Sequence, residues 1–165
     1  MNIPEHILEI FLMPGDFFWG DSSTRIRTVL GSCISICMWH PVKRIGGMCH
    51  YMLPTRNVDF LRENIRLNGK YGDEAWEMFA REIRKANTKP SEYIVKLFGG
   101  SNMFLSRDAD VPDIGVGNRN IELARKIISD FQLNLVSEDL GGNKPRRIHF
   151  DIWSGNVWLK RQENE

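Results

Sequence analysis

The chain lacks three features that would place it in a familiar class at once: an excess of charge, a long apolar run and a set of paired cysteines. Lys and Arg together number 22 and Asp and Glu 21 in 165 residues, for a formal net charge of +1. Without a basic excess, the sequence gives no indication of a nucleic-acid partner or of a membrane-surface partner. No stretch is apolar over the length that spans a bilayer, so we expect no membrane insertion.

Cysteine is scarce, and its distribution is informative. The three cysteines, Cys33, Cys37 and Cys49, fall within one short segment. An odd number in a single segment is not typical of a secreted disulfide framework. Residues 1–20 also show no basic start followed by an apolar run, which a secretory signal would have. We therefore expect a cytoplasmic protein whose thiols stay free for chemistry.

The overall composition is that of an ordinary globular protein, with 42% hydrophobic and 26% charged residues. No repeat, linker or low-complexity tract divides the sequence, so residues 1–165 are expected to form a single domain. Apolar patterning predicts eight strands. They are expected at residues 5–12, 25–30, 34–39, 44–53, 92–98, 133–137, 146–152 and 156–160. Residues 25–30 alternate polar and apolar, whereas 34–39 are a continuous apolar run.

Two amphipathic helices are predicted, at residues 73–86 and 119–131. Asp73 is the expected N-cap of the first helix. One face of that helix carries Trp76, Phe79 and Ile83, and one face of the second carries Ile121, Ala124, Ile128 and Phe131. This mixture of elements predicts an α/β (α+β) fold: a single-domain mixed-sheet sandwich with helices packed on the outside.

The most unusual segment is residues 28–54, which holds all three cysteines and two of the four histidines. A corner of small residues lies in it between two predicted strands. The corner consists of Gly31, Ser32 and Cys33. Small neighbours leave space for a substrate beside a nucleophilic thiol, and backbone N–H groups near Ser32–Ile34 are candidates for holding an oxyanion. Glycines 46 and 47, inside the next predicted strand, indicate either close approach of another backbone or a β-bulge.

His50 is the candidate base for Cys33. It lies seventeen positions further on, in the next predicted strand, and the turn at residues 40–44 would bring it back beside the thiol. Because successive strand residues face opposite sides, Cys49 would then point away from the site.

The pattern alone leaves two other interpretations open. On its own it favours a core role for the three cysteines, because free cysteine is commonly buried. Together with His50 they also number four potential zinc ligands. The spacing disfavours zinc, since Cys33 and Cys37 would stand about 13 Å apart along one strand face, at about 3.3 Å per residue.

The segment LGSCISICMWHPVKRIGGMCHYMLP (30–54) resembles the signature of CheD, the chemoreceptor glutamine deamidase family of bacterial and archaeal chemotaxis. Four further motifs follow in the family's order. They are YGDEAWEMF (71–79), KLFGGSNMF (96–104), IGVGNRNIE (114–122) and EDLGGNKPRRIHFDIWSGNVWLK (138–160). The resemblance spans roughly residues 25–160, and several ordered motifs are far more specific than one Cys–His pair.

The resemblance implies a protein-glutamine glutaminase, which hydrolyses receptor glutamine side-chain amides to glutamate and releases ammonia. It places Cys33 at the nucleophile position and His50 at the base position. A threonine upstream of the cysteine completes the site; Thr28 is the best match, and Thr24 is the alternative. The resemblance implies no metal and no organic cofactor.

The substrates implied by the resemblance are methyl-accepting chemotaxis receptors, with hydrolysis of receptor methyl esters as a second activity. The alternative function is an adaptor that binds and stimulates the CheC phosphatase, with little enzymatic role. A toxin-like deamidase of host proteins is a weaker interpretation. Two groups of residues are more typical of turns and solvated loops than of a site border. They are Gly99, Gly100, Ser101, Asn102, Gly141 and Gly142, and the basic cluster Lys144, Arg146 and Arg147.

Overall fold

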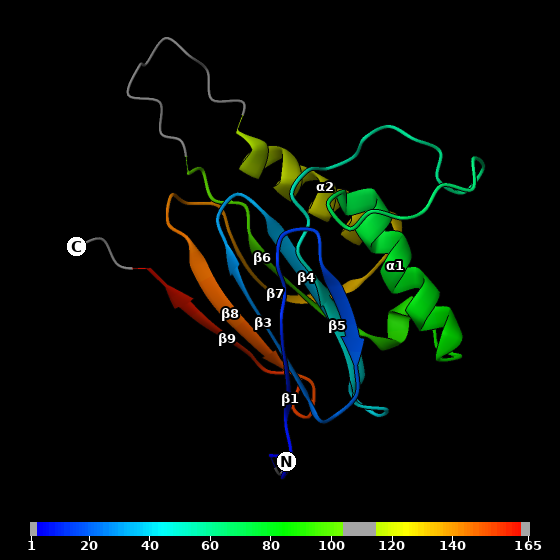
Figure 1. Ribbon diagram of the computed structural model, residues 1–165, viewed down its shortest axis with the longest axis vertical. Coiled ribbons are helices and arrows are strands. Elements are labelled where there is room, and N and C mark those ends of the chain that lie inside the picture. The colour runs from blue at the N-terminus through cyan, green and yellow to red at the C-terminus, as the bar shows by residue number, and fades with distance from the viewer. Residues whose placement is uncertain (1–2, 104–114, 163–165) are drawn as a thin grey trace.

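The computed structural model describes residues 3–103 and 115–162. Nine strands in these ranges form two facing sheets, and helices cover the outer side of one sheet (Figure 1). The strands are β1 (Leu8–Phe11), β2 (Phe17–Gly20), β3 (Thr24–Leu30), β4 (Ile34–His40), β5 (Ile45–Cys49), β6 (Ile94–Gly99), β7 (Asn134–Leu140), β8 (Arg146–Asp151) and β9 (Val157–Arg161). The predicted mixed α/β sandwich with outer helices is confirmed. Phe104, the last residue of one sequence motif, and Ile114, the first residue of another, lie outside the described residues.

The smaller sheet has the strand order β1-β3-β8-β9. Its strand β3 buries every second side chain, so one face of the sheet looks into the sandwich and the other is open. The inward residues of β3 and β8 pack against β4, β5 and β6 in a core between the sheets. The polar–apolar alternation of residues 25–30, which predicted a strand, fits this one-sided burial.

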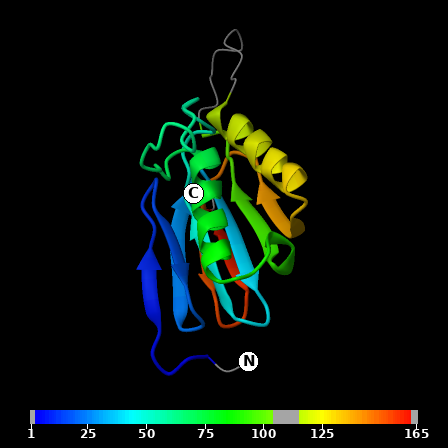
Figure 2. The same ribbon diagram turned by 90° about the vertical axis from the view of Figure 1, so that its right-hand side faces the viewer.

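The larger sheet has the order β2-β5-β4-β6-β7 and is covered on both faces. Helices α1 (Gly72–Lys85) and α2 (Val116–Asp130) lie across its outer face, as Figure 2 shows, and a short 3-10 helix η1 (Pro90–Glu92) precedes β6. Strand β4 contributes alternate residues to the core under the helices and to the core between the sheets. Burial on both faces accounts for its continuous apolar sequence.

The helix faces follow the predicted spacing, with two corrections. Trp76, Phe79 and Ile83 are all buried against the larger sheet. Phe131 follows the last turn of α2 and remains about half exposed, stacked on Trp76 at 4.7 Å between ring centroids. Asp73 is not the N-cap of α1: Tyr71 holds that position with extended backbone and no side-chain cap. The Asp73 carboxylate instead accepts hydrogen bonds from Glu74 N and Thr55 Oγ1.

One strand was missed, and the ends of others differ from the prediction: β1 is shorter than residues 5–12, and β7 extends beyond residues 133–137. Strand β2 was missed because its four residues, FFWG, are all half-buried and show no alternation. Strand β5 is shorter than predicted and ends at Cys49, so His50 lies just beyond it. Of the two alternatives predicted for glycines 46 and 47, close backbone approach is the one observed, since a Cβ on Gly46 would lie 2.2 Å from Met38 O and one on Gly47 2.7 Å from Phe18 O.

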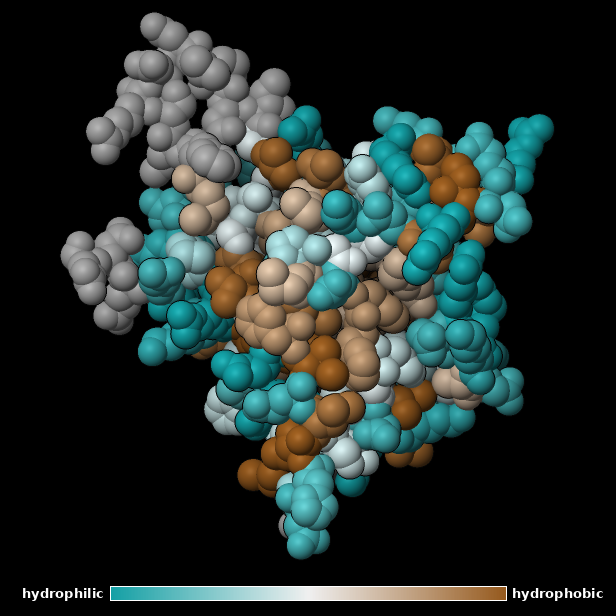
Figure 3. Space-filling model, in the orientation of Figure 1, coloured by the Kyte–Doolittle hydropathy of each residue, from teal (hydrophilic) through white to brown (hydrophobic). Residues whose placement is uncertain are grey.

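The face seen in Figure 3 has apolar side chains at its centre and hydrophilic side chains around them. Along β1 and the residue pair that follows it, Leu8, Phe11 and Met13 are each more than half exposed. None of the helices in the described residues is long and apolar enough to cross a membrane.

Candidate active site

The corner 31–33 is the place where the chain passes from the smaller sheet to the larger one, between β3 and β4. Cys33 is half-buried there and packs against the core between the sheets. Gly31 is tightly fitted, because a Cβ on it would lie 3.1 Å from Met103 Cγ. A larger residue at position 31 would therefore press on the Met103 side chain, while the space for a substrate beside the thiol stays a prediction.

Backbone hydrogen bonds hold the corner on two sides. Gly100 N donates to Cys33 O at 2.9 Å, and Ser101 N donates to Gly31 O at 3.0 Å. On the other side, Ile34 and Tyr51 exchange two hydrogen bonds of 3.1 and 3.0 Å. Gly100 and Ser101 thus contact the corner directly through their backbone, whereas Asn102 N donates to Gly142 O.

The oxyanion candidates at the corner are not equivalent. The Ile34 N–H already donates a hydrogen bond to Tyr51 O. It can therefore bind a substrate only if that hydrogen bond breaks. The N–H groups of Ser32 and Cys33 donate to no partner among the described residues. The N–H groups of Ser32 and Cys33 therefore remain the candidates for holding an oxyanion.

His50 shares the inner face of the larger sheet with Cys33. Strands β4 and β5 pair antiparallel, and in the same register Ile34 pairs with Tyr51. This register sets Cys33 opposite Met52 and Ser35 opposite His50, so Cys33 and His50 are diagonal neighbours on one face. The turn before β2 fixes the His50 backbone, because Gly15 N donates to His50 O and His50 N donates to Asp16 O.

Thr28 is the threonine that meets the histidine. Its Oγ1 lies 2.7 Å from His50 Nδ1 and 2.8 Å from Leu12 O, and both side chains are buried. A hydroxyl has one proton, and a carbonyl can only accept, so Thr28 donates to Leu12 O and accepts from His50 Nδ1–H. The neutral imidazole therefore carries its lone pair on Nε2. Thr24, the alternative, is 3.5 Å from Asp21 Oδ1 at the start of β3.

Burial keeps both candidate groups neutral at rest. It lowers the pKa of His50 to about 4, although the negative charge of Asp16 opposes this in part. Burial also raises the pKa of the Cys33 thiol to about 11. The resting state at neutral pH is therefore a thiol and a neutral imidazole, and not a thiolate–imidazolium pair.

The other two cysteines take the core positions that the pattern favoured for them. Cys37 lies in the core between the sheets, and Cys49 lies in the core under the helices, on the opposite face from His50. Ile36 N donates to Cys49 Sγ at 3.4 Å. Within residues 3–103 and 115–162, no group of three or more His, Cys, Asp and Glu side chains is arranged to hold a metal ion.

Residues 52–161 match the CheD family, described as CheD chemotactic sensory transduction. The chain is 48% identical over 156 residues to "Probable chemoreceptor glutamine deamidase CheD 3" of Dechloromonas aromatica (strain RCB), across 94% of this chain and 89% of that protein. This chain belongs to the CheD family. It is also 44% identical over 165 residues to "Probable chemoreceptor glutamine deamidase CheD" of Pseudomonas savastanoi pv. phaseolicola (strain 1448A / Race 6), across 100% of this chain and 91% of that relative.

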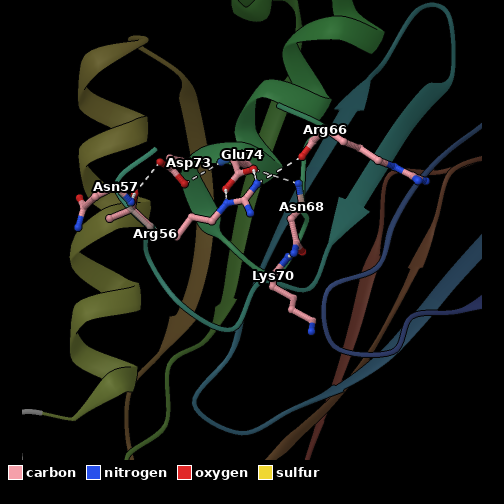
Figure 4. A network of polar contacts seen from close by, with 8 residues as sticks. Arg56, Asn57, Arg66, Asn68, Lys70, Asp73 and Glu74 are labelled. Carbon is pink, nitrogen blue, oxygen red and sulfur yellow. Dashed lines mark hydrogen bonds and ion pairs between the residues drawn. The ribbon is translucent and has the colours of Figure 1, made fainter. Parts of the chain in front are cut away.

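In this CheD-family chain, a buried carboxylate anchors the long loop that follows His50. Glu74, in the first turn of α1, accepts two hydrogen bonds from Arg56, at 2.9 and 2.8 Å, and one from Asn68 N at 3.1 Å (Figure 4). Arg56 also donates to Arg66 O at 3.3 Å. The segment leaving His50 is tied to the end of this loop, since Met52 N donates to Lys70 O at 2.8 Å.

Two further buried polar residues at this CheD site escaped the sequence analysis, Asn120 and Arg146. Arg146 had been grouped with a solvated loop, but it is buried and donates to Asp139, Gly99 O, Ser101 Oγ and Gly141 O. It therefore joins the end of β6 to the loop before β8. The sequence feature that could have indicated both residues is their position inside two of the glycine-containing family motifs, 114–122 and 138–160.

Proposed function

We propose that this protein is a chemoreceptor glutamine deamidase that uses Cys33 as nucleophile and His50 as base. The observation that carries the proposal is the hydrogen bond between Thr28 and His50, which leaves the lone pair of the imidazole on Nε2. A thiol of high pKa needs such a neighbouring base to become a nucleophile. The names of the two relatives supply the substrate class, the glutamine side chains of chemoreceptors.

The proposed reaction has two halves. His50 Nε2 takes the thiol proton as Cys33 Sγ attacks the amide carbon of the glutamine side chain, and the N–H groups of Ser32 and Cys33 hold the oxyanion. Collapse of this intermediate breaks the C–N bond, and the imidazolium gives its proton to the departing ammonia. Water, deprotonated by the same His50, then attacks the thioester and releases glutamate and the free thiol.

The direct test is mass spectrometry of Gln-to-Glu conversion, a gain of about 1 Da, in a cognate receptor fragment. Cys33→Ala is expected to lower conversion by at least about 10³-fold, as loss of a nucleophile does in comparable hydrolases. Cys37→Ala, which removes a buried thiol on the same inner face, is expected to keep the activity and serves as the control. Equal conversion by wild type and Cys33→Ala would refute Cys33 as the nucleophile.

The remaining parts of the proposal concern the partners and the setting. We propose methyl-accepting chemotaxis receptors as substrates, a CheC phosphatase as a second protein partner and a single domain across residues 1–165. We also propose the cytoplasm as the location, supported by three cysteines that are all free. A pull-down of CheC with wild type and with Cys33→Ala separates the two roles. If the variant binds CheC but does not deamidate the receptor, the protein has two separate functions. If neither wild type nor the variant binds CheC, CheC is rejected as a partner.

A further inference from the structure

Asn120 is fully buried at the start of the second turn of α2, beside the corner that carries Cys33. Its side-chain Nδ2 donates to two backbone carbonyls, Ser32 O at 3.0 Å and Met52 O at 2.9 Å. Ser32 directly precedes Cys33, and Met52 follows His50 by two positions. A single amide group therefore links the chain segment of the proposed nucleophile to that of the proposed base.

The position of this link is important because the backbone ladder between the two segments stops there. Ile34 and Tyr51 are the last pair to exchange hydrogen bonds. The next pair in register is Cys33 and Met52, but Met52 N turns away and donates to Lys70 O. Beyond this last hydrogen-bonded pair, the two hydrogen bonds from Asn120 to Ser32 O and Met52 O connect the two segments.

Asn120 is itself held in place from two directions. Tyr51 Oη donates to Asn120 O at 2.5 Å, which ties the helix to the residue that follows His50. Three positions earlier, Gly117 lets α2 approach the end of β6, because a Cβ there would lie 2.6 Å from Gly100 O and from Ser101 O. The same end of β6 binds Cys33 O through Gly100 N. A side chain fixed this well can impose a spacing on the segments that it joins.

The oxygen of the same amide group, Asn120 Oδ1, holds no neighbouring segment of the described chain in place. Asn120 Oδ1 is buried and has no hydrogen-bond partner among the described residues. An unpaired buried acceptor destabilises a fold, so its presence calls for an explanation. The explanation offered by the contacts is that a planar NH₂ donor is required between Ser32 O and Met52 O, and the amide oxygen accompanies it.

We propose that Asn120 is a positioning residue for the deamidation: it fixes the spacing between Cys33 and His50 by joining Ser32 O to Met52 O. This rests on the proposed function, because it assigns the two segments their roles as carriers of nucleophile and base. Asn120 acts through the backbone of both segments and does not touch the substrate.

The first test compares Asn120→Leu with Asn118→Leu. Leucine has the same number and branching of side-chain heavy atoms as asparagine, although it is bulkier, and it has no donor; Asn118 lies on the exposed side of the same helix. Misplacement of reacting groups by about 1 Å can cost about 10²-fold in rate. We therefore expect Asn120→Leu to lower kcat by about 10²-fold while KM changes less than about threefold, and Asn118→Leu to change neither. Equal kcat for the two variants would overturn the proposal. Asn120→Ser serves as a milder variant if the leucine variant does not fold.

The second test does not need the deamidation reaction. The rate at which iodoacetamide alkylates Cys33 is followed by peptide mass spectrometry, with and without His50→Gln. In wild type, loss of the base is expected to slow alkylation at neutral pH, whereas in the Asn120 variants it is expected to have little further effect because the pair is already misaligned. An equal slowing by His50→Gln in both backgrounds would show that Asn120 only supports the fold.

The two tests also separate this proposal from the proposed function. If wild type converts no receptor glutamine, the deamidase proposal fails, and the alkylation rates still report whether Asn120 aligns Cys33 with His50. If wild type is active and the Asn120 variants retain its kcat and its dependence on His50, the positioning role fails alone.

Discussion

The two sheets of this protein differ in how they are covered, and the candidate site lies where the chain passes from one to the other. The smaller sheet has one open face, and its strand β3 alternates between buried and exposed residues. The larger sheet lies between the smaller sheet and two helices, and its strand β4 is buried almost throughout. The comparison teaches that Thr28 comes from the thinly covered sheet, while Cys33 and His50 border the doubly covered one.

The polar side chains of the candidate site therefore lie between the two sheets, in a core to which both contribute. The smaller sheet supplies a hydroxyl on its inner face, and the larger supplies the imidazole and the thiol from the ends of its central strands. Neither sheet alone buries these groups. Since burial is the cause of both pKa shifts, the neutral resting state of the site depends on the packing of the two layers.

The largest expected effect concerns stability and tests the difference in covering directly. Ile36→Ala in β4 removes a fully buried side chain beneath the helices and is expected to cost about 2–5 kcal/mol of unfolding free energy. Val29→Ala in β3 truncates a side chain that is 41% exposed on the open face and is expected to cost about 0.5 kcal/mol or less. Urea unfolding measures both, and equal costs would contradict the comparison.

Next in size is an acid effect that should arise between the sheets. The folded-state pKa of His50, about 4, lies below its ordinary value of 6.5, so the unfolded chain takes up a proton first as the pH falls. The stability that neutral His50 contributes is complete above pH 6.5 and is lost as the pH falls to about 4, up to about 3 kcal/mol.

The measurement is the unfolding free energy of wild type and His50→Gln between pH 7 and 4. The variant should lose less stability on acidification than wild type. His149→Gln is the matched control, because His149 sits half-buried on the open face of the smaller sheet and burial lowers its pKa in the same direction. A difference for His149→Gln as large as that for His50→Gln would show that covering by the second sheet is not the cause.

The smallest expected effect distinguishes two threonines on the inner face of β3. Thr28→Val keeps the shape of the side chain but removes the acceptor for His50 Nδ1–H, and is expected to lower kcat/KM about tenfold, the equivalent of one hydrogen bond of about 1.4 kcal/mol. Thr24→Val removes an equally buried hydroxyl that does not reach His50 and should leave kcat/KM unchanged. Receptor deamidation rates decide between them, and equal losses would mean that Thr28 only supports the strand.

The local pattern of the sequence predicted most of the elements but not all of their ends. Regular alternation or a long apolar face marks an element whose burial is regular, as in β3, β4 and the two helices. Strand β2 escaped because a short, half-buried edge strand has no such period, and its pairing with β5 is a contact between distant segments. Asp73 was mistaken for a cap because its actual partner, Thr55, lies 18 positions away along the chain.

The sequence by itself determined the two-layer fold, the family motifs and the pairing of Cys33 with His50 as candidates, because periodicity and motif spacing are local properties of a chain. Only the tertiary structure showed that Thr28 and not Thr24 contacts His50, that the Ile34 N–H donates to Tyr51 O, and that Asn120 lies between Ser32 and Met52. These contacts join residues that are 16 to 88 positions apart in the sequence. Such distances are set by how the layers pack, and no local pattern records them.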